Sequence, residues 1–554
     1  MPTPYGGSFL LDTSPDLFTP EDFTAEHRAI AKTTDDFWTR EVAPNLEAIQ
    51  QQDFAVLRRT LRKSAALGLV GVLLPEQYGG IELDLISSLI VAESLGRDGS
   101  YAVCHGAQAG IGALPVFLFG TDAQKNKYLP RLASAELIAA YCLTEAQAGS
   151  DALAARTRAD LSADGSHYVL NGQKVWITNG GIADLYTVFA KIGGEKFTAF
   201  LVERAWTGVL PGAEEKKMGL KGSSTTAVYF DNVQIPVENV LGEIGRGHSI
   251  AFNILNLGRL NLAVSAHGKC RYVLAETIRY ARERRAFGKS IAEFGLMQHK
   301  LAEMAVRMFV NESMIYRVAG HIQDSGQPLM KAAEDFAAEC SMIKIFGSEA
   351  LDYVVDEAVQ IHGGYGYHQD YAVERAFRDA RVNRIFEGTN EINRLLVTGM
   401  LLKRAKKGTL PLAGAVKDLS ATATGDVLTN AKKVGLFLLG VASKHYGESL
   451  EEHQEVVAAI TDVLMNTLAM ESATLRARKS GRSNAADMAA VFADETMENI
   501  KASAKTVLAA CSEGHALRTN LALLRGLTAY ELVNAVVLRR RIAARLLEAG
   551  RYVV

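Results

Sequence analysis

Cysteine and long apolar runs are scarce in this chain of 554 residues. Its five cysteines lie far apart and include no CxxC pair, which argues against a disulfide scaffold and the common zinc-ligand spacings. The most prominent apolar run, residues 435–442, is far shorter than the roughly 20 residues that span a bilayer. The amino-terminal residues lack the basic start and apolar segment of a signal peptide. We therefore expect a cytoplasmic protein with reduced thiols and no transmembrane segment.

An excess of charge of one sign is also missing. Lys plus Arg number 60 and Asp plus Glu 62, so the net charge of -2 gives no whole-chain attraction to nucleic acid. Neither a phosphate loop of the form GxxxxGK[ST] nor a GxSxG nucleophile elbow occurs. The hydrophobic content of 48% is ordinary for a globular protein. The length predicts about three or four structural units at roughly 150 residues each.

Proline is unevenly distributed, and this indicates where long helices lie. Ten of the 12 prolines lie at or before Pro236, so the later segments can form uninterrupted helices. Between residues 138 and 247 short β-rich runs appear instead, and Asn171-Gly172 predicts a hairpin between the first two. These runs are 168–170, 175–178, 186–189, 197–202 and 228–230. One block of strands between helical regions favours a mainly α fold with a central β domain over a doubly wound parallel sheet.

The predicted domain organisation follows from these changes in composition along the chain. The segment 403–425 is rich in Gly, Ala, Ser and Thr, which predicts a linker. From Lys403 to the last residue, 21 basic residues against 15 acidic ones give a local charge of +6. We predict an N-terminal arm (1–25), a helical domain (26–137), a β domain (138–247), a helical bundle (248–402), the linker (403–425) and a helical C-terminal extension (426–554). The glycine run at 242–247 reads as a turn into a helix, because its spacing differs from a dinucleotide-binding loop.

Three strings combine aromatic, hydroxyl and glycine residues. They are YCLTE at 141–145 running into AGSD at 148–151, KVWITNG at 174–180, and RIFEGTNE at 384–391. An aromatic side chain stacks on a flat ring, hydroxyl and backbone N–H groups bond its polar edge, and glycine permits close approach. Taken singly, each string is also compatible with a strand, a turn or a helix cap.

Together and in this order, the strings resemble the acyl-CoA dehydrogenase family of flavoenzymes over roughly residues 20–400. Two more strings, ERRAFG at 283–288 with Gln298 and QIHGGYG at 360–366, match in family order. The resemblance implies the family's fold of a helical domain, a β-barrel domain and a helical bundle, with flavin adenine dinucleotide (FAD) as cofactor. The domains predicted above from the proline distribution and the β-rich runs follow the same order.

The resemblance also implies roles for individual residues. By this resemblance, the residues that line the flavin ring are Tyr141, Leu143, Thr144, Gly149, Ser150, Trp176 and Thr178. Thr389 and Glu391 complete the site, and some relatives carry glutamine at the position of Glu391. The diphosphate and adenosine portions, commonly held across a subunit boundary, are assigned to Arg284, Phe287, Gln298, Gln360, Gly363 and Gly364. The thioester substrate is assigned to Ser150, Asn256, Arg259, Phe386 and Gly388.

In the family, the α-proton of an acyl thioester leaves to a base while a hydride leaves the β-carbon, giving a trans-2-enoyl thioester. Glu387 occupies the position of that base. Burial disfavours the charged form of a carboxyl group, so we expect a raised pKa for Glu387 that brings it nearer the working pH. Taken alone, Glu387 also fits a carboxylate at a helix N-terminus. Electron-transfer flavoprotein is the implied electron acceptor.

The C-terminal extension, which most members of the family lack, resembles the very-long-chain acyl-CoA dehydrogenase branch. Four strings support this branch: FTPEDFT at 18–24, GGIAD at 180–184, EKKMG at 215–219 and LNLGR at 255–259. Gly112 and Pro115 stand at the expected bottom of the acyl pocket, where shorter-chain relatives carry larger polar side chains. The resemblance therefore implies fatty acid β-oxidation of long acyl chains by a homodimer.

Two questions stay open on the sequence alone. Basic residues near Leu436-Phe437-Leu438-Leu439 within 403–445 fit peripheral binding to an anionic membrane surface, and equally a solvated linker followed by a helix buried on its own protein. Two alternative functions also stay open. An acyl-CoA oxidase shares the fold and the base, and a flavin-binding scaffold or assembly factor keeps the fold without turnover.

Overall fold

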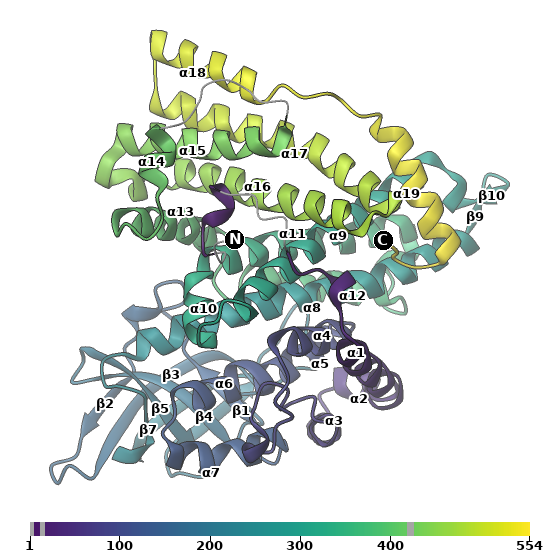
Figure 1. The fold of residues 1–554 in the computed structure, drawn as a ribbon. Helices are drawn as coiled ribbons and strands as arrows, with labels where there is room; N and C mark the ends of the chain where they lie inside the picture. Colours follow the sequence, from purple (N-terminus) through teal and green to yellow (C-terminus); the bar gives the residue numbers. More distant parts are fainter. Residues whose placement is uncertain (1–4, 12–16, 418–425) are drawn as a thin grey trace. The chain divides into compact units, whose positions relative to one another are not determined.

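The computed structural model describes residues 5–11, 17–417 and 426–554 (Figure 1). The chain forms two compact units. We call Thr24–Lys269 with Arg378–Val382 the sheet unit, and Met1–Phe23, Cys270–Phe377 and Asn383–Val554 the bundle unit. The division falls inside the long helix α8 (Gly247–Glu283), which begins at the last residue of the glycine run at 242–247, as expected for a turn into a helix.

The sheet unit opens with helices whose starts are set by side-chain caps. Thr24, Asp53, Asp84, Asp98 and Thr121 each accept a hydrogen bond from a backbone N–H of the first turn that follows, which satisfies a donor that the helix leaves free. The helices are α1 (Ala25–Phe37), α2 (Leu46–Gln50), α3 (Phe54–Ala66), α4 (Leu85–Leu95), α5 (Gly99–Gly106), a π-helical turn (Ala107–Gly112), α6 (Ala113–Phe119) and α7 (Asp122–Ala133).

A mixed sheet of eight strands follows these helices. Its order is β6-β7-β3-β2-β4-β5-β8, and β1 pairs with β4 in parallel. The strands are β1 (Ala139–Cys142), β2 (Arg158–Leu161), β3 (His167–Thr178), β4 (Leu185–Ile192), β5 (Lys196–Glu203), β6 (Val209–Glu214), β7 (Thr225–Pro236) and β8 (Val240–Leu241). Apolar side chains of these strands form one buried core, which includes Tyr186, Phe200 and Val228. The predicted fold class, mainly α with a central β domain, is confirmed.

The hairpin predicted at Asn171-Gly172 is wrong. β3 runs without a break from His167 to Thr178, and the register of its pairing with β7 shifts between Leu170 and Gly172. Gly172 has a φ of +151° and lies so close to Thr157 that an added Cβ would stand 2.6 Å from the Thr157 hydroxyl oxygen. The pair therefore forms a β-bulge, which needs the same backbone freedom as a tight turn.

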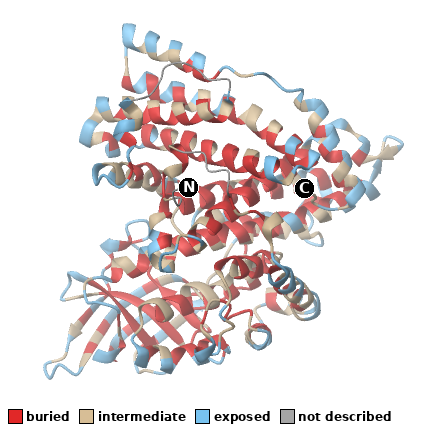
Figure 2. Cartoon of the chain, in the orientation of Figure 1, coloured by how far each residue is buried: buried red, intermediate tan, exposed pale blue. Residues whose placement is uncertain are grey.

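The bundle unit is almost entirely helical. Its elements are the end of α8, a short hairpin β9 (Arg285–Ala286) and β10 (Lys289–Ser290), and the helices α9 (Gly295–Gln323), α10 (Leu329–Asp335), α11 (Ala337–His362), α12 (Ala372–Ala380), α13 (Asn390–Lys406), α14 (Leu412–Lys417), α15 (Val427–Tyr446), α16 (Gln454–Ser480), α17 (Ser483–Cys511), α18 (Gly514–Leu527) and α19 (Ala535–Ala549). Helices α9, α11 and α16 are the most deeply buried (Figure 2).

The segment expected to be a linker, 403–425, is partly helical. α13 continues through Lys406 because Leu401 is buried in its last turns, and Leu412 begins α14. Residues 418–425 lie outside the described residues.

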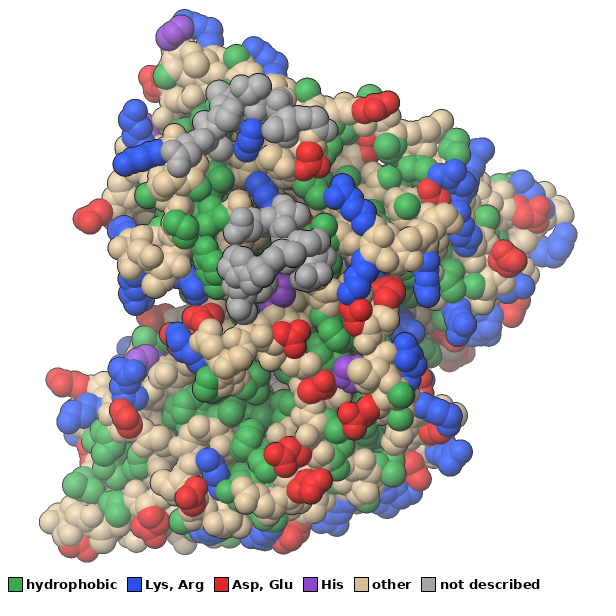
Figure 3. All heavy atoms as spheres, viewed as in Figure 1, with side chains coloured by type: hydrophobic (Ala, Val, Ile, Leu, Met, Phe, Trp, Pro, Cys, Tyr) green, Lys and Arg blue, Asp and Glu red, His purple; other side chains and the backbone are tan. Residues whose placement is uncertain are grey.

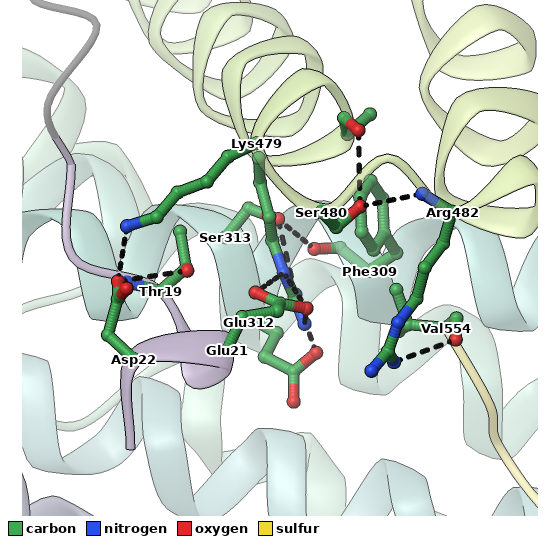
Figure 4. A network of polar contacts seen from close by, with 12 residues as sticks. Thr19, Glu21, Asp22, Phe309, Glu312, Ser313, Lys479, Ser480, Arg482 and Val554 are labelled. Atoms are coloured by element: carbon green, nitrogen blue, oxygen red, sulfur yellow. Dashed lines mark hydrogen bonds and ion pairs between the residues drawn. The ribbon is translucent and has the colours of Figure 1, made fainter. Parts of the chain in front are cut away.

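Buried charges join the C-terminal extension to the rest of the bundle unit. Arg476 on α16 is 2% exposed and bonds Glu312 on α9 at 2.7 Å and Glu21 of the N-terminal arm at 3.0 Å. Beside it, Lys479 bonds Asp22 of the arm at 2.5 Å (Figure 4). α15, α16 and α17 pack on one another, and α16 also packs on α9 and α13. The extension is thus continuous with the core of this unit.

The apolar residues that would anchor residues 403–445 to lipid are instead buried. Leu436, Leu438 and Leu439 are at most 6% exposed, and Lys432 forms an ion pair with the fully buried Glu471. On the face drawn in Figure 3, acidic and basic side chains are interspersed. The structure therefore favours the second interpretation, a helix buried on its own protein.

Two helical segments in the described residues are long and apolar enough to cross a bilayer by length and composition. They are Gly99–Phe119 and Gln454–Ser480, and 50% and 78% of their most apolar windows are buried inside the protein. Buried core helices meet the same two criteria.

Candidate active site

The strand string assigned to the flavin ring lies on β1 and the loop that follows it. Tyr141 and Leu143 are buried, and the ring of Tyr141 meets Phe189 edge-on at 5.1 Å. Glu145 and Ala148 close a tight turn through two backbone hydrogen bonds, which leaves Gly149 and Ser150 exposed. The Thr144 carbonyl oxygen accepts a hydrogen bond from the N–H of Val175 at 2.9 Å. The fold therefore brings the first and second strings side by side.

Trp176 lies in a second β-bulge of β3, between Lys174 and Ile177. Its φ is +61°, which is unusual for a bulky residue, and its side chain is 60% exposed. A bulge turns a side chain out of the alternating pattern of the strand, so the indole ring lies at the surface of the sheet. Thr178 follows at the end of the strand, paired with Thr225 of β7.

A buried ion pair beneath these strings escaped the sequence analysis. The Lys174 ammonium, 0% exposed, donates to the Glu145 carboxylate at 2.8 Å and to the Leu143 carbonyl oxygen at 3.1 Å. Glu145 also accepts from the N–H groups of Arg156 and Thr157. Burial would raise the pKa of Glu145, but Lys174 and these donors hold it below its ordinary value. Both residues stand inside the quoted strings, yet no spacing signal distinguishes a buried pair from exposed charges.

Asn256 and Arg259, assigned to the substrate, lie one turn apart on α8. Both are buried, and the Arg259 guanidinium donates to the Asn256 side-chain oxygen at 2.9 Å. The bond fixes the direction of the guanidinium.

An apolar cavity within the sheet unit lies next to this part of α8. Leucine, valine, isoleucine, alanine and glycine line most of it, with residues from α4, α5, the π-helical turn and α8. Ala109 and Gly110 of the π-helical turn belong to its wall, whereas Gly112 and Pro115 do not. A Cβ at Gly112 would stand 2.6 Å from the Ala107 carbonyl oxygen and from the Ala139 Cβ. Gly112 thus packs closely against β1.

Glu387 lies in the bundle unit on the turn between residues 384 and 390. It is half-buried, with a φ of +58°, and Gly388 follows with a φ of +80°. Two successive left-handed residues are costly where the first is not glycine, and such strain persists only where the surroundings enforce it. Phe386 before it is half-buried. The strained backbone places Glu387 on a sharply bent turn ahead of α13.

The residues expected to complete this site follow directly. Thr389 caps α13, because its hydroxyl accepts from the N–H of Ile392 at 3.2 Å. The N–H of Glu391 itself and the Thr389 hydroxyl hold the pKa of Glu391 below its ordinary value. Both residues therefore stand within one helical turn of Glu387.

Buried polar side chains hold the Glu387 turn from behind. The Lys344 ammonium on α11 donates to the Gly388 carbonyl oxygen at 2.7 Å and to the Asn390 side-chain oxygen at 2.8 Å. The Asn393 amide donates to the carbonyl oxygens of Glu387, Gly388 and Thr389. The sequence signal that could have found Lys344 is a lone charge within the apolar run SMIKIF at 341–346.

The residues assigned to the diphosphate and adenosine portions fall into two groups in the bundle unit. Arg284 lies over the Tyr365 ring at 5.7 Å, near the exposed Gly363 and Gly364, where an added Cβ would meet nothing within 4 Å. Phe287 stands 96% exposed on the β9–β10 hairpin, and Gln298 donates to the Ala292 carbonyl oxygen at 3.1 Å. Gln360 is exposed near the end of α11.

The groups on the sheet unit fit a flat heteroaromatic ring. The exposed indole of Trp176 offers a stacking face, and the accessible hydroxyls of Thr144, Ser150 and Thr178 offer partners for a polar edge. An added Cβ at Gly149 would meet nothing within 4 Å, so a ring can approach the backbone there. Taken unit by unit, the sheet unit offers surfaces for a flat ring and for an apolar chain, and the bundle unit offers a carboxylate on a strained turn that can accept a proton.

Comparison with known proteins identifies the class. Family models described as acyl-CoA dehydrogenase domains match as follows: the N-terminal domain at residues 24–136, the middle domain at 140–233, and two C-terminal domain models at 245–402 and 430–526. The chain belongs to the acyl-CoA dehydrogenase family, and the resemblance stated from the sequence is confirmed.

Individual relatives narrow the comparison. A probable acyl-CoA dehydrogenase of Bacillus subtilis is 46% identical over 99% of this chain and 98% of its own length. A crystal structure of an acyl-CoA dehydrogenase complexed with FAD from Bacillus anthracis superimposes with a TM-score of 0.98 at 46% identity, covering 100% of both chains. The rat mitochondrial very-long-chain specific acyl-CoA dehydrogenase is 44% identical over 70% of this chain and 57% of its own length.

Proposed function

We propose that this protein is an FAD-dependent dehydrogenase that converts a fatty acyl-CoA to the trans-2-enoyl-CoA, the first step of fatty acid β-oxidation. The observation that carries the proposal is the Glu387 turn: a half-buried carboxylate on a strained backbone, inside the span that a C-terminal domain model of the family matches. The apolar cavity of the sheet unit supports an acyl substrate, because a hydrocarbon chain is stabilised by apolar walls.

Glu387 acts as the base that removes the α-proton. Gly388 leaves room for the thioester, and Phe386 limits the access of water to the carboxylate. Hydrogen bonds to the thioester oxygen stabilise the negative charge that develops as the proton leaves, which lowers the barrier. The N–H of Glu387 is the donor that this chain contributes to that oxygen.

FAD is the cofactor, and when bound it accepts the hydride from the β-carbon. Tyr141, Leu143, Thr144, Gly149, Ser150, Trp176 and Thr178 would hold its ring, with Thr389 and Glu391. Arg284, Phe287, Gln298, Gln360, Gly363 and Gly364 would hold its diphosphate and adenosine portions. The exposed Trp176 ring and the open space at Gly149 and Gly363 support these assignments.

Long acyl chains are the preferred substrates in this proposal. The cavity wall at Gly106, Ala109 and Gly110 is made of small residues, which leaves depth for a chain. Activity confined to acyl chains of about four to eight carbons would contradict the preference, since such chains need little apolar depth.

Electron-transfer flavoprotein takes the electrons onward, and two copies of the chain form a homodimer in the cytoplasm. The dimer is supported by apolar side chains left exposed in the bundle unit: Phe287 is 96% exposed, Tyr367 87% and Leu296 76%. Light scattering of the purified protein tests the oligomeric state, and a monomer would contradict it.

Anaerobic titration of the purified holoprotein with acyl-CoAs of graded length tests the reaction. Wild-type protein should lose its flavin absorbance with long substrates, whereas Glu387→Gln should keep FAD and show no such bleaching. Glu334→Gln, an exposed glutamate of α10, is the matched control and should bleach normally. Bleaching of the Glu387→Gln variant at the wild-type rate would overturn the base assignment.

The same titration separates the neighbouring functions. Rapid hydrogen peroxide release in air would indicate an acyl-CoA oxidase instead. Bound FAD with no bleaching by any acyl-CoA would indicate a flavin-binding scaffold.

A further inference from the structure

Lys344 lies on α11 in entirely buried surroundings. The side chain is 0% exposed, and its helical neighbours Ile343 and Ile345 are also fully buried. Placing an ammonium group in such surroundings costs free energy, which its hydrogen bonds must offset. Two of those bonds go to the Glu387 turn, at the Gly388 carbonyl oxygen and the Asn390 side chain.

Three carbonyl oxygens of the turn point toward this buried layer. The left-handed backbone at Glu387 and Gly388 directs three successive carbonyl oxygens at the Asn393 amide, with distances of 3.4, 2.8 and 3.0 Å. Asn390 is fixed in turn by Ser348, whose hydroxyl accepts from its amide at 3.0 Å. Lys344, Asn390 and Asn393 together supply the surroundings that a strained turn requires.

The same layer continues into the C-terminal extension. The Asn390 amide also donates to Glu349 at 3.1 Å, and Glu349 accepts from the Arg394 guanidinium at 2.8 Å. Arg394 reaches Asp462 on α16 at 2.8 Å, and Thr461 donates to the Arg394 carbonyl oxygen at 2.6 Å. α16 belongs to the segment after residue 426. Hydrogen bonds therefore lead from the extension to the turn without a gap.

We propose that Lys344 is a positioning residue that sets the backbone of the Glu387 turn, and that the extension supports the same turn through Asp462 and Arg394. The proposal rests on the proposed function of Glu387 as the base. A base displaced by about 1 Å loses as much as 100-fold in rate. Bonds that fix the turn therefore act on the rate of proton removal, while substrate binding in the sheet unit is unaffected.

Lys344→Met tests the first part, with Lys432→Met as the matched control. Both lysines are buried and polar-bonded in the bundle unit, but Lys432 pairs with Glu471 rather than with the turn. In stopped-flow measurements on the holoproteins, Lys344→Met should lower the rate of flavin reduction by about 10- to 100-fold with an unchanged acyl-CoA dissociation constant. Lys432→Met should stay within about 2-fold of the wild-type rate, because it leaves the turn in place.

Hydrogen exchange gives a second readout that does not depend on turnover. The amides of residues 387–393 should exchange faster in Lys344→Met and remain protected in Lys432→Met. Equal loss of rate in the two variants, or a Lys344→Met rate within 2-fold of wild type, would overturn the proposal. Where Lys344→Met fails to fold, Asn393→Ala tests the same turn, since it removes the amide that bonds three carbonyl oxygens.

Asp462→Asn tests the link to the extension. Asp462 and Arg394 border a polar cavity of about 350 Å³, so solvent reaches the pair, and we expect a smaller fall of about 2- to 5-fold. A rate equal to wild type would remove the extension from the proposal. Glu387→Gln measured alongside keeps the two ideas separate: if it reduces flavin normally, the proposed function fails, whereas a blocked Glu387→Gln with a normal Lys344→Met fails only this inference.

Discussion

Two buried lysines, one in each unit, hold the backbone of a strained segment in different ways. Lys174 in the sheet unit and Lys344 in the bundle unit are both 0% exposed, and each donates to a backbone carbonyl oxygen of a string that matches the family. Each also lies close to a non-glycine residue with positive φ, Trp176 or Glu387. The partner of Lys174 is a carboxylate 29 positions away in the sequence, whereas the layer around Lys344 extends from α11 to α16.

The two segments differ in how far along the chain their supporting side chains are spread. The strings assigned to the flavin ring are held within the sheet unit, by the Lys174–Glu145 pair and by the Ala251 carbonyl oxygen of α8, which accepts from the Tyr141 hydroxyl at 3.3 Å. The Glu387 turn depends on side chains from three helices, one of which belongs to the C-terminal extension. We infer that the extension stabilises the catalytic turn as well as the bundle.

Arg476→Met removes the cation that joins the C-terminal extension to α9 and the N-terminal arm. This variant should give the largest loss of stability. Removing the guanidinium leaves Glu312, 5% exposed, and Glu21 without their shared cation, and uncompensated buried charge costs about 3–5 kcal/mol. Urea unfolding measures the loss. Arg478→Met is the control, because Arg478 is exposed two positions later, and it should change the free energy of unfolding by less than about 0.5 kcal/mol. Equal effects would contradict the role of Arg476.

Lys174→Met removes the ion pair with Glu145 in the sheet unit. It should lower the free energy of unfolding by a smaller amount, about 3 kcal/mol. Glu145 keeps hydrogen bonds from Arg156, Thr157 and Gln147, which continue to stabilise its carboxylate after the ammonium is removed. The variant should also bind FAD more weakly, measured by ultrafiltration of the released flavin. Lys196→Met, an exposed lysine of β5, should match wild type in both measurements. Unchanged FAD affinity in Lys174→Met would separate the ion pair from the flavin strings.

His105 gives the sheet unit a pH dependence that arises from burial. It lines the apolar cavity, contacts the Ser64 hydroxyl at 3.1 Å, and burial lowers its pKa from 6.5 to about 4. Because the unfolded chain takes up the proton first, stability is intact above pH 6.5 and falls as the pH drops toward 4, by roughly 3 kcal/mol in total. His105→Gln should remove this component. Parallel curves of unfolding free energy against pH for the two proteins would contradict the prediction.

The sequence predicted the order of elements and the family strings because both depend on local composition. Scarce proline after Pro236 indicated long helices, and α8, α9, α11 and α16 are found there. Val273, Leu274, Thr277, Ile278 and Ala281 recur at the three-and-four spacing of one helix face, and each is at most 1% exposed. Periodicity of this kind reports burial directly.

Local patterns failed where a residue meets a distant partner. Asn171-Gly172 suits a hairpin and a bulge equally, and pairing with β7 decides for the bulge. Gly112 packs so closely against β1 that an added Cβ would stand 2.6 Å from the Ala139 Cβ, a contact that no local pattern indicates. The apolar run at 436–439 suited a lipid surface and a protein core equally, and the packing of α16 and α17 on α15 decides for the core.

By itself, then, the sequence determined the family and the order of its domains, because the strings that carry the resemblance stand in recognisable local order. Only the tertiary structure decided what holds them in place. The pairing of Lys174 with Glu145 and the layer from Lys344 to Asp462 join residues far apart in the chain. Such bonds form because buried polar groups must find partners wherever packing brings them, and packing leaves no periodic trace in a sequence.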